Sequence, residues 1–248
     1  GTVGFMEGPT VAVLSGPPMQ SNRVGEVWHY FDKQIAYPAT LLPADDLEDS
    51  MLEDVDVLVL PDGTYETWLT DERAELVTRW VKQGGRLIAL GDANGALAQH
   101  SAYTLTSKET KTPADTTSEA APSPQSYGAQ QRKALSRSAP GSIHRVQLDT
   151  THPLGFGLHS PYFTLKQNSD AYTYLGGGGT VGVLEEPAPV SGFMGHQAQQ
   201  KVDDTLLFGA QRLGEGHVVY LVDNPLFRGF WYSGHVLFSN AVFFVGNS

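Results

Sequence analysis

The stretch GGRLIALGDANGAL, residues 84–97, decides the fold. Its segment RLIAL (86–90) is a short apolar-rich run preceded by two glycines, a pattern typical of a buried strand. The glycines of GDANG (91–95) then predict a tight turn, and a short helix is expected from about Asn94. In enzymes such a strand-turn-helix corner presents a nucleophile. Here the corner contains neither cysteine nor serine.

The preceding residues alternate between strand and helix patterns. Strands are expected in TVAVLSGPP (10–18), ATLL (39–42) and VDVLVLPDG (55–63). Apolar residues at helical spacing predict one helix over 23–35 and a second one, capped by Thr70 and ended by Gly84 and Gly85. Strands that alternate with helices indicate βαβ units. We therefore predict an α/β fold with a doubly wound, mostly parallel, flavodoxin-like sheet.

The chain reads as a single domain over residues 1–248 with three parts. Residues 1–100 form the βαβ core, and 101–141 form a polar insertion in which Ser, Thr, Ala and Pro make up more than half of the residues. Such a composition predicts mobility, with room for a short helix around 126–138. Residues 142–248 form a β-rich half that a C-terminal helix over 233–245 closes. Its expected strands are SIHRVQLD (142–149), AYTYL (171–175), TVGVLEE (180–186), TLLFGAQRL (205–213) and HVVYLVDNP (217–225).

Composition excludes several function classes. The net charge is -11, so the surface repels phosphate backbones and nucleic-acid binding is not expected. No apolar run is long enough to span a membrane. The absence of cysteine excludes disulfides, thiolate metal sites and a cysteine nucleophile. Because the chain begins with Gly1 rather than an initiator methionine, we expect it to be excised from a longer protein.

The corner at 91–95 resembles the elbow of class I glutamine amidotransferases, which reads Gly-x-Cys-x-Gly. On this motif the cysteine position falls on Ala93, between Asp92 and Asn94. The family also has a His-x-Glu pair near the C-terminus, and none of the eight histidines here is followed two residues later by glutamate. The resemblance therefore implies a degenerate elbow with no catalytic residue. Asp92 as a carboxylate nucleophile is the alternative.

A longer set of motifs resembles the amidotransferase-like domain that follows the catalytic domain of large bacterial zinc carboxypeptidases of the carboxypeptidase A type. These motifs are LSGPP (14–18), LVLPDG (58–63), GGRLIALG (84–91), LDTTHPLGFG (148–157) and DNPLFRGFWYSGHVLFSNAVFFV (223–245). The resemblance implies a secreted or periplasmic parent whose peptidase domain is the partner of this chain. That family binds zinc through His-x-x-Glu and a distant third histidine in the separate catalytic domain. His-x-x-Glu does not occur here, so neither a metal nor another cofactor is expected in this chain.

Five further residues are candidates for a ligand site or an interface: Asp62, Asp223, Asn224, Arg228 and Trp231. The aromatic residues around Arg228 either close the core of the domain or form a contact surface. Two functions compete with that of a catalytically silent accessory domain acting in stability, substrate positioning or partner contacts. One is a small-ligand or glycan-binding module at the carboxyl ends of the strands. The other is a hydrolase that uses Asp62, Asp92 or Asp223 with a nearby histidine.

Two weaker patterns favour structural interpretations. PADDLEDSMLEDVD (43–56) predicts a solvated acidic helix face, with calcium binding as the alternative. LGGGGTVGV (175–183) predicts a flexible turn, because it lacks the Lys-Ser/Thr ending of a phosphate-binding loop.

Overall fold

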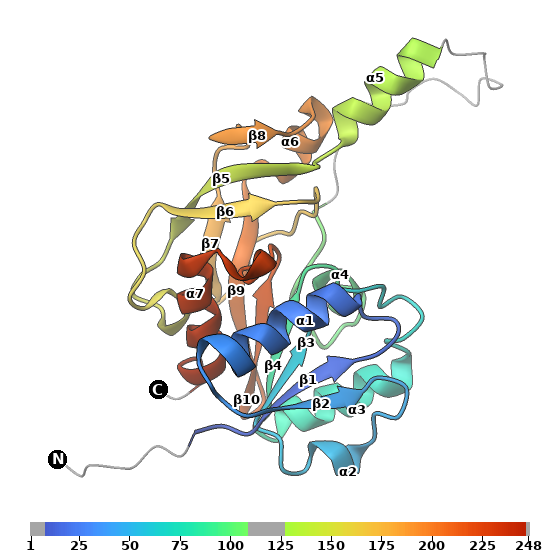
Figure 1. Cartoon of the computed structure of the whole chain (residues 1–248), viewed down its shortest axis with the longest axis vertical. Helices are drawn as coiled ribbons and strands as arrows, with labels where there is room; N and C mark the ends of the chain where they lie inside the picture. The colour runs from blue at the N-terminus through green and yellow to red at the C-terminus, as the bar shows by residue number, and fades with distance from the viewer. Residues whose placement is uncertain (1–7, 109–126, 247–248) are drawn as a thin grey trace.

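The computed structural model describes residues 8–108 and 127–246. Its centre is a ten-stranded sheet in the order β2-β1-β3-β4-β10-β9-β7-β5-β6, with β8 paired to β5 (Figure 1). The five strands from β2 to β10 are parallel, and the remaining pairs are antiparallel. The α/β prediction with a doubly wound sheet and β-rich C-terminal additions is confirmed.

The parallel strands follow the predicted runs closely. They are β1 (Val11–Ser15), β2 (Ala39–Pro43), β3 (Val57–Leu60), β4 (Arg86–Leu90) and β10 (Gly216–Leu221). All four side chains of β3 are fully buried, because helices cover both faces of this part of the sheet.

The crossover helices are α1 (Ser21–His29), the π-helical turn η1 (Tyr30–Gln34), α2 (Asp49–Leu52), α3 (Asp71–Lys82) and α4 (Ala93–Leu97). The helix predicted over 23–35 is therefore regular only to His29. The π turn keeps Tyr30 and Phe31 buried and leaves Ile35 37% exposed. α3 begins as predicted, because Thr70 Oγ1 accepts a hydrogen bond from the Arg73 N–H.

The antiparallel half contains β5 (Gly141–Leu148), β6 (Tyr162–Lys166), β7 (Thr180–Leu184), β8 (Ser191–Phe193) and β9 (Thr205–Leu213). Its helices are α5 (Tyr127–Arg137), η2 (Pro153–Gly155), α6 (His196–Val202), η3 (Phe227–Gly229) and α7 (Tyr232–Phe243). α7 lies on the same face of the sheet as α1 (Figure 1). It contacts η1, which continues α1, through the aromatic pair of Tyr30 with Phe238. No helix in the described ranges is long and apolar enough to cross a bilayer.

Two sequence predictions need correction in detail. The strand expected at 171–175 does not form, because β7 already pairs with β9 and leaves Tyr172 only isolated bridges to Ser107 and Leu206. The first residues of the predicted insertion are part of the packed structure, since Tyr103 and Leu105 are buried. Residues 109–126, where mobility is also predicted, lie outside the described residues. The predicted helix in this region is α5, and the glycines at 176–179 form a turn before β7.

Candidate functional site at the carboxyl ends of the parallel strands

The corner after β4 is held by a buried amide. Asn94 is fully buried, and its Nδ2 donates to the carbonyl oxygens of Gly91 at 2.8 Å and Leu221 at 3.0 Å. These bonds tie the start of α4 to both β4 and β10. Ala93, which matches the cysteine position of the amidotransferase elbow, is only 1% exposed. The positive φ of the corner, 55°, belongs to Gly91, and Asp92 has ordinary helical dihedrals. This corner therefore does not present residue 93 to a substrate.

The loop after β3 meets this corner through Asp62. Its Oδ1 accepts a hydrogen bond of 2.9 Å from the Asp92 N–H, and its Oδ2 lies 3.6 Å from Arg23 Nε. Asp62 and Asp92, which the sequence offers only as separate candidates, are thus in direct contact.

A pocket of about 270 Å³ lies beside Asp92. It is bounded by the loop after β3, the first turns of α4 and the loop after β6, which contributes Asp170 and Tyr172. Partial burial, the nearby charges of Asp62 and Asp170, and a hydrogen bond between the Asp92 and Asp170 side chains raise the pKa of Asp92 to about 6, and Arg23 opposes this shift. No histidine is among the described residues that line the pocket. The pocket therefore offers two neighbouring carboxyl groups, Asp92 and Asp170, without a histidine among its described lining residues.

Glu26 of α1 organises the loop after β10. Both carboxylate oxygens contact Arg23 Nη1, at 3.2 and 3.1 Å. The same carboxylate accepts hydrogen bonds from Asn224 Nδ2 at 2.6 Å and from the Arg228 N–H at 3.0 Å. Asn224 is therefore a loop-anchoring residue. Arg228 has a φ of 50°, uncommon for a residue with a side chain, and Glu26 helps to hold it there.

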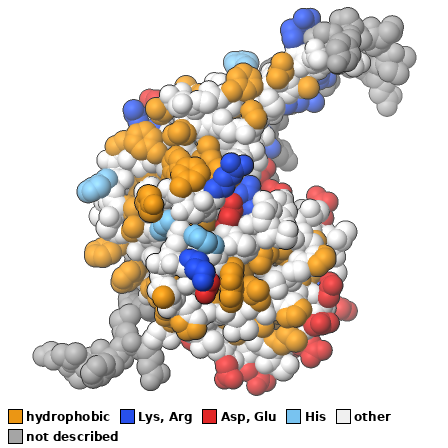
Figure 2. All heavy atoms as spheres, in the orientation of Figure 1, with side chains coloured by type: hydrophobic (Ala, Val, Ile, Leu, Met, Phe, Trp, Pro, Cys, Tyr) orange, Lys and Arg blue, Asp and Glu red, His pale blue; other side chains and the backbone are white. Residues whose placement is uncertain are grey.

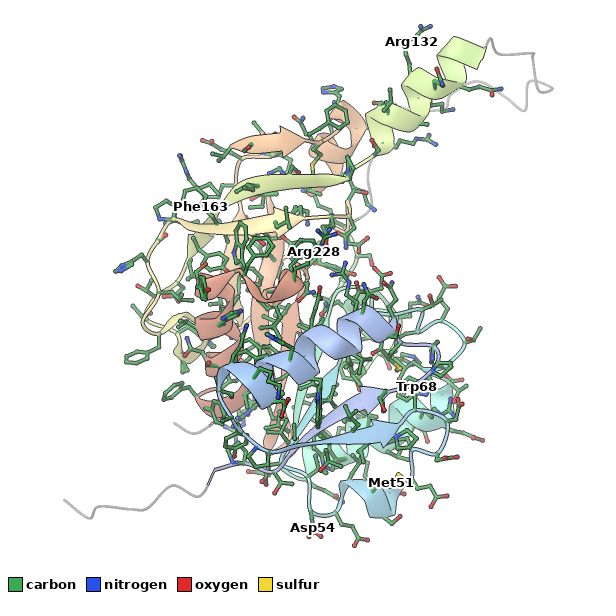
Figure 3. All side chains as sticks on the ribbon, viewed as in Figure 1. Met51, Asp54, Trp68, Arg132, Phe163 and Arg228 are labelled. Atoms are coloured by element: carbon green, nitrogen blue, oxygen red, sulfur yellow. The ribbon has the colours of Figure 1, made fainter. Side chains whose placement is uncertain are left out.

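Exposed aromatic side chains surround this anchored loop. The Arg228 guanidinium lies 5.1 Å from the Phe227 ring centre, and Trp231 Nε1 donates to the Phe163 carbonyl oxygen at 3.1 Å. Phe230 is 51% exposed and Tyr232 is 77% exposed. We call Phe163, Phe230, Trp231 and Tyr232 the aromatic surface. Figure 2 shows hydrophobic side chains gathered over β6 and η3 with basic side chains beside them, and Figure 3 labels Phe163 and Arg228 within this region.

Asp223 occupies a different environment from the other candidate residues. It is 3% exposed, and its carboxylate pairs with Lys166 Nζ at 3.0 Å and accepts from Thr164 Oγ1 at 2.9 Å. His144, also buried, lies near this pair and contacts Ser142 Oγ through Nε2 at 2.8 Å. The ligand role considered for Asp223 is not supported by this geometry, since the carboxylate is sealed inside the β-rich half. It holds β6 against the end of β10.

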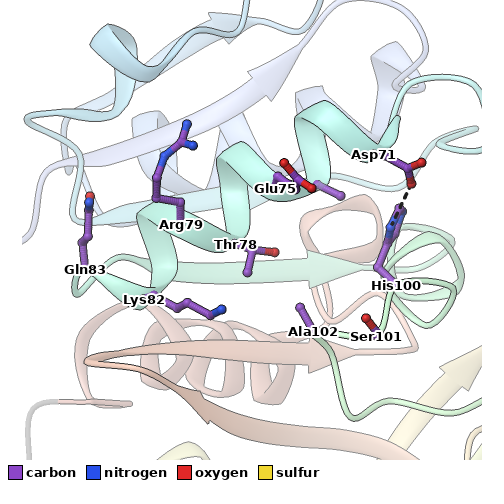
Figure 4. Close-up of a pocket in the computed structure, with 10 residues that line it drawn as sticks. Asp71, Glu75, Thr78, Arg79, Lys82, Gln83, His100, Ser101 and Ala102 are labelled. Atoms are coloured by element: carbon purple, nitrogen blue, oxygen red, sulfur yellow. Dashed lines mark ion pairs between the residues drawn. The ribbon is translucent and has the colours of Figure 1, made fainter.

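A second, larger groove of about 710 Å³ runs along α3 (Figure 4). It is lined by side chains of both signs, including Asp71, Glu75, Arg79 and Lys82, and His100 Nδ1 lies 3.9 Å from Asp71 Oδ1. The acidic stretch before it contributes Asp49, which binds Arg79 Nη2 through both carboxylate oxygens at 2.8 and 2.7 Å. Across residues 8–108 and 127–246, no group of three or more His, Cys, Asp or Glu side chains is placed to hold a metal ion.

Solved structures share this architecture at low sequence identity. A GMP synthase subunit homologue from Thermoplasma acidophilum is 12% identical, with a TM-score of 0.56 over 96% of this chain and 94% of that chain. A ThuA-like protein from Parabacteroides merdae is 11% identical, with a TM-score of 0.56 over 95% of this chain and 89% of that one. The chain has a class I glutamine amidotransferase-like fold.

The same fold also occurs within longer enzymes. The β-galactosidase from Bacillus circulans sp. alkalophilus is 18% identical, with a TM-score of 0.52, and the match covers 94% of this chain but 30% of that chain. No protein-family model matches the sequence, and no curated protein is similar to it in sequence.

Proposed function

We propose that this chain is a catalytically silent, amidotransferase-like accessory domain of a secreted or periplasmic zinc carboxypeptidase. The observation that carries the proposal is the corner after β4, where the nucleophile position is the buried Ala93. The adjacent pocket offers Asp92 without a histidine among the described residues that line it. Hydrolysis of glutamine by a thiolate needs a nucleophile and a base in contact, and this corner supplies neither.

The place of the fold in other enzymes supports an accessory role. In the β-galactosidase from Bacillus circulans the matching region is 30% of the chain, so the fold serves there as one part of a larger protein. The ordered motifs of the carboxypeptidase resemblance, from LSGPP (14–18) to the run 223–245, point to a peptidase domain as the neighbour here. The zinc ligands then belong to that peptidase domain.

The aromatic surface supports a role in partner contact. Phe230 and Tyr232 expose 51% and 77% of their area, although both lie next to a loop that Glu26 fixes in place. Aromatic residues beside an arginine are the side chains that contribute most at protein interfaces. Exposed aromatic side chains beside an anchored loop fit a docking surface for the peptidase domain of the same parent chain.

Two measurements test the proposal. The purified chain is expected to release no ammonia from glutamine, and Ala93→Cys is expected to release none either, because the new thiol would be buried and without a base. Ammonia release above the buffer rate by either protein contradicts catalytic silence.

The coding sequence on either side of this segment tests whether the longer protein is a zinc carboxypeptidase. An in-frame domain with His-x-x-Glu and a distant third histidine supports the proposal. A coding sequence that lacks such a domain contradicts the carboxypeptidase assignment and leaves the ammonia result unaffected.

A further inference from the structure

The charged side chains that line the pocket beside Asp92 are all acidic. Glu66, Asp92 and Asp170 are among its lining residues, and no lysine, arginine or histidine is among the described residues that line it. Arg23 is the cation that opposes the raised pKa of Asp92. Its guanidinium is engaged by Glu26, by Gln167 Oε1 at 3.0 Å and by Asp62. The pocket therefore repels anions and attracts a cation.

Tyr172 adds a hydrogen-bonding group of a different kind. The residue is only 3% exposed and lines the same pocket. Its hydroxyl lies at the pocket-lining Gly95, where an added Cβ would stand 3.4 Å from the hydroxyl oxygen. Within the described part of the chain, this hydroxyl hydrogen-bonds no residue. A hydroxyl that lines a pocket without a protein partner can hydrogen-bond a ligand. Its position near the carboxyl groups of Asp170 and Asp92 suits a polar one.

We propose that this pocket binds the primary ammonium group of a small organic amine between Asp92 and Asp170, with the Tyr172 hydroxyl as a further acceptor. Three N–H donors of an ammonium match two carboxylates and one hydroxyl oxygen. Charge-assisted bonds of this type are among the stronger hydrogen bonds in proteins. A volume of about 270 Å³ accommodates a short alkyl amine such as a lysine-like side chain. The inference concerns this chain alone and is independent of the carboxypeptidase parent.

Protonation of the pocket carboxyl groups opposes binding of the amine. The charged groups that act on Asp92 are Asp62 from the loop after β3, Asp170 from the loop after β6, and Arg23 from α1. Glu66 lines the same pocket. Only Arg23 among them favours the charged form of Asp92. A bound ammonium adds a second positive charge, so the amine binds best when both carboxyl groups are ionised. Binding must therefore weaken as the pH falls through about 6, the pKa of Asp92.

The probe is n-butylammonium chloride, titrated into the whole chain labelled with ¹⁵N and followed by NMR. At pH 7.5 we expect saturable shifts at Gly95, Asp170 and Tyr172, and at least about tenfold weaker binding at pH 5.0. n-Butanol, which has the same chain without the charge, is expected to give no saturable shift. Equal binding of butanol, or no shift with butylammonium, overturns the proposal. Saturable shifts from Ca²⁺ alone, with none from butylammonium, also overturn it.

Two variants locate the site, with Glu185→Gln as the matched control. Asp170→Asn is expected to weaken butylammonium binding at least about tenfold, and Tyr172→Phe several-fold. Circular dichroism shows whether each variant is folded. If Asp170→Asn is folded and binds as the wild type does, the assignment to this pocket is wrong. Ammonia release from glutamine, by contrast, tests only the proposed accessory function.

Discussion

Asp62 Oδ1 accepts a 2.9 Å hydrogen bond from the backbone N–H of Asp92, which joins the loop after β3 to the corner after β4. The carboxylate also fills the space against Gly91, where an added Cβ would lie 2.5 Å from Asp62 Cγ. Gly91 has a φ of 55°. The aspartate and the glycine therefore form one unit, in which the acidic side chain reaches the corner only because the facing residue has no side chain.

Gly91→Ala is expected to lower the free energy of unfolding by about 2–4 kcal/mol, from backbone strain and the clash with Asp62 combined. The matched control is Gly16→Ala, where φ is 84° and no atom lies within 4 Å of the added Cβ. This control should cost only about 1–2 kcal/mol. Urea unfolding of both variants, and of Gly91→Ala in an Asp62→Ala background, separates the two contributions. An equal loss in both glycine variants would show that Asp62 does not restrict the corner.

The sequence could predict the parallel half because its strands are short apolar runs buried on both faces, as β3 and β4 are. β6 escapes prediction because it is an edge strand in which exposed and buried side chains alternate over five residues. In the site, Asp62 and Asp92 follow neighbouring strands and could be predicted to meet. Asp170 and Tyr172 could not be predicted to join them. They lie in the loop after β6, and the folding of the antiparallel half brings this loop to the pocket, which no local sequence pattern indicates.

Asp223→Asn is expected to destabilise the protein by about 3–5 kcal/mol, because it leaves the fully buried Lys166 ammonium without its counter-charge. The control is Asp49→Asn, which removes an exposed ion pair with Arg79 and should cost no more than about 1 kcal/mol. Replacing both buried partners, as in Asp223→Asn with Lys166→Met, should recover part of the loss. Denaturant unfolding measures all three variants, and similar losses at residues 223 and 49 would contradict the structural role given to Asp223.

The stability of the chain is expected to fall as the pH drops below about 6.5, the usual pKa of an unfolded histidine. Burial, and then the charge of Lys166, lower the pKa of His144, although Asp223 opposes the shift. The unfolded state therefore binds a proton that the folded state resists, so stability is complete above this pH and lost below it. His144→Gln should flatten the decline between pH 7.5 and 5.5, whereas the exposed His159→Gln should leave it unchanged. Burial also lowers the pKa of His152, His217 and His235, so part of the slope should persist.

The raised pKa of Asp92 should change the stability of the chain with pH in the opposite direction. Its pKa is raised to about 6 in the folded protein, above the ordinary value of about 4 for an unfolded aspartate. The folded state therefore carries an unfavourable charge above pH 6, and this penalty disappears as the pH falls to about 4. Asp92→Asn should raise the melting temperature at pH 7.5 and give no increase near pH 4, while the exposed Asp46→Asn serves as the control. A stabilisation of equal size at both pH values would mean that the charge of Asp92 is not its cause.

The residues of the aromatic surface differ in how much they contribute to the stability of this chain. Trp231 is partly buried and donates to the Phe163 carbonyl oxygen, so Trp231→Ala should cost about 1–3 kcal/mol from lost packing and one lost hydrogen bond. Phe230 and Tyr232 are 51% and 77% exposed. Their replacement by alanine should change the free energy of unfolding of this chain by no more than about 0.5 kcal/mol.

In the longer protein that we propose, the same two changes should weaken contact with the peptidase domain and increase protease cleavage between the domains. Lys201→Ala, on α6 in the antiparallel half, is the matched surface control. If Phe230→Ala and Tyr232→Ala instead unfold the isolated chain, these rings belong to its core. If they leave both the chain and the domain contact intact, the aromatic surface is not where the peptidase domain binds.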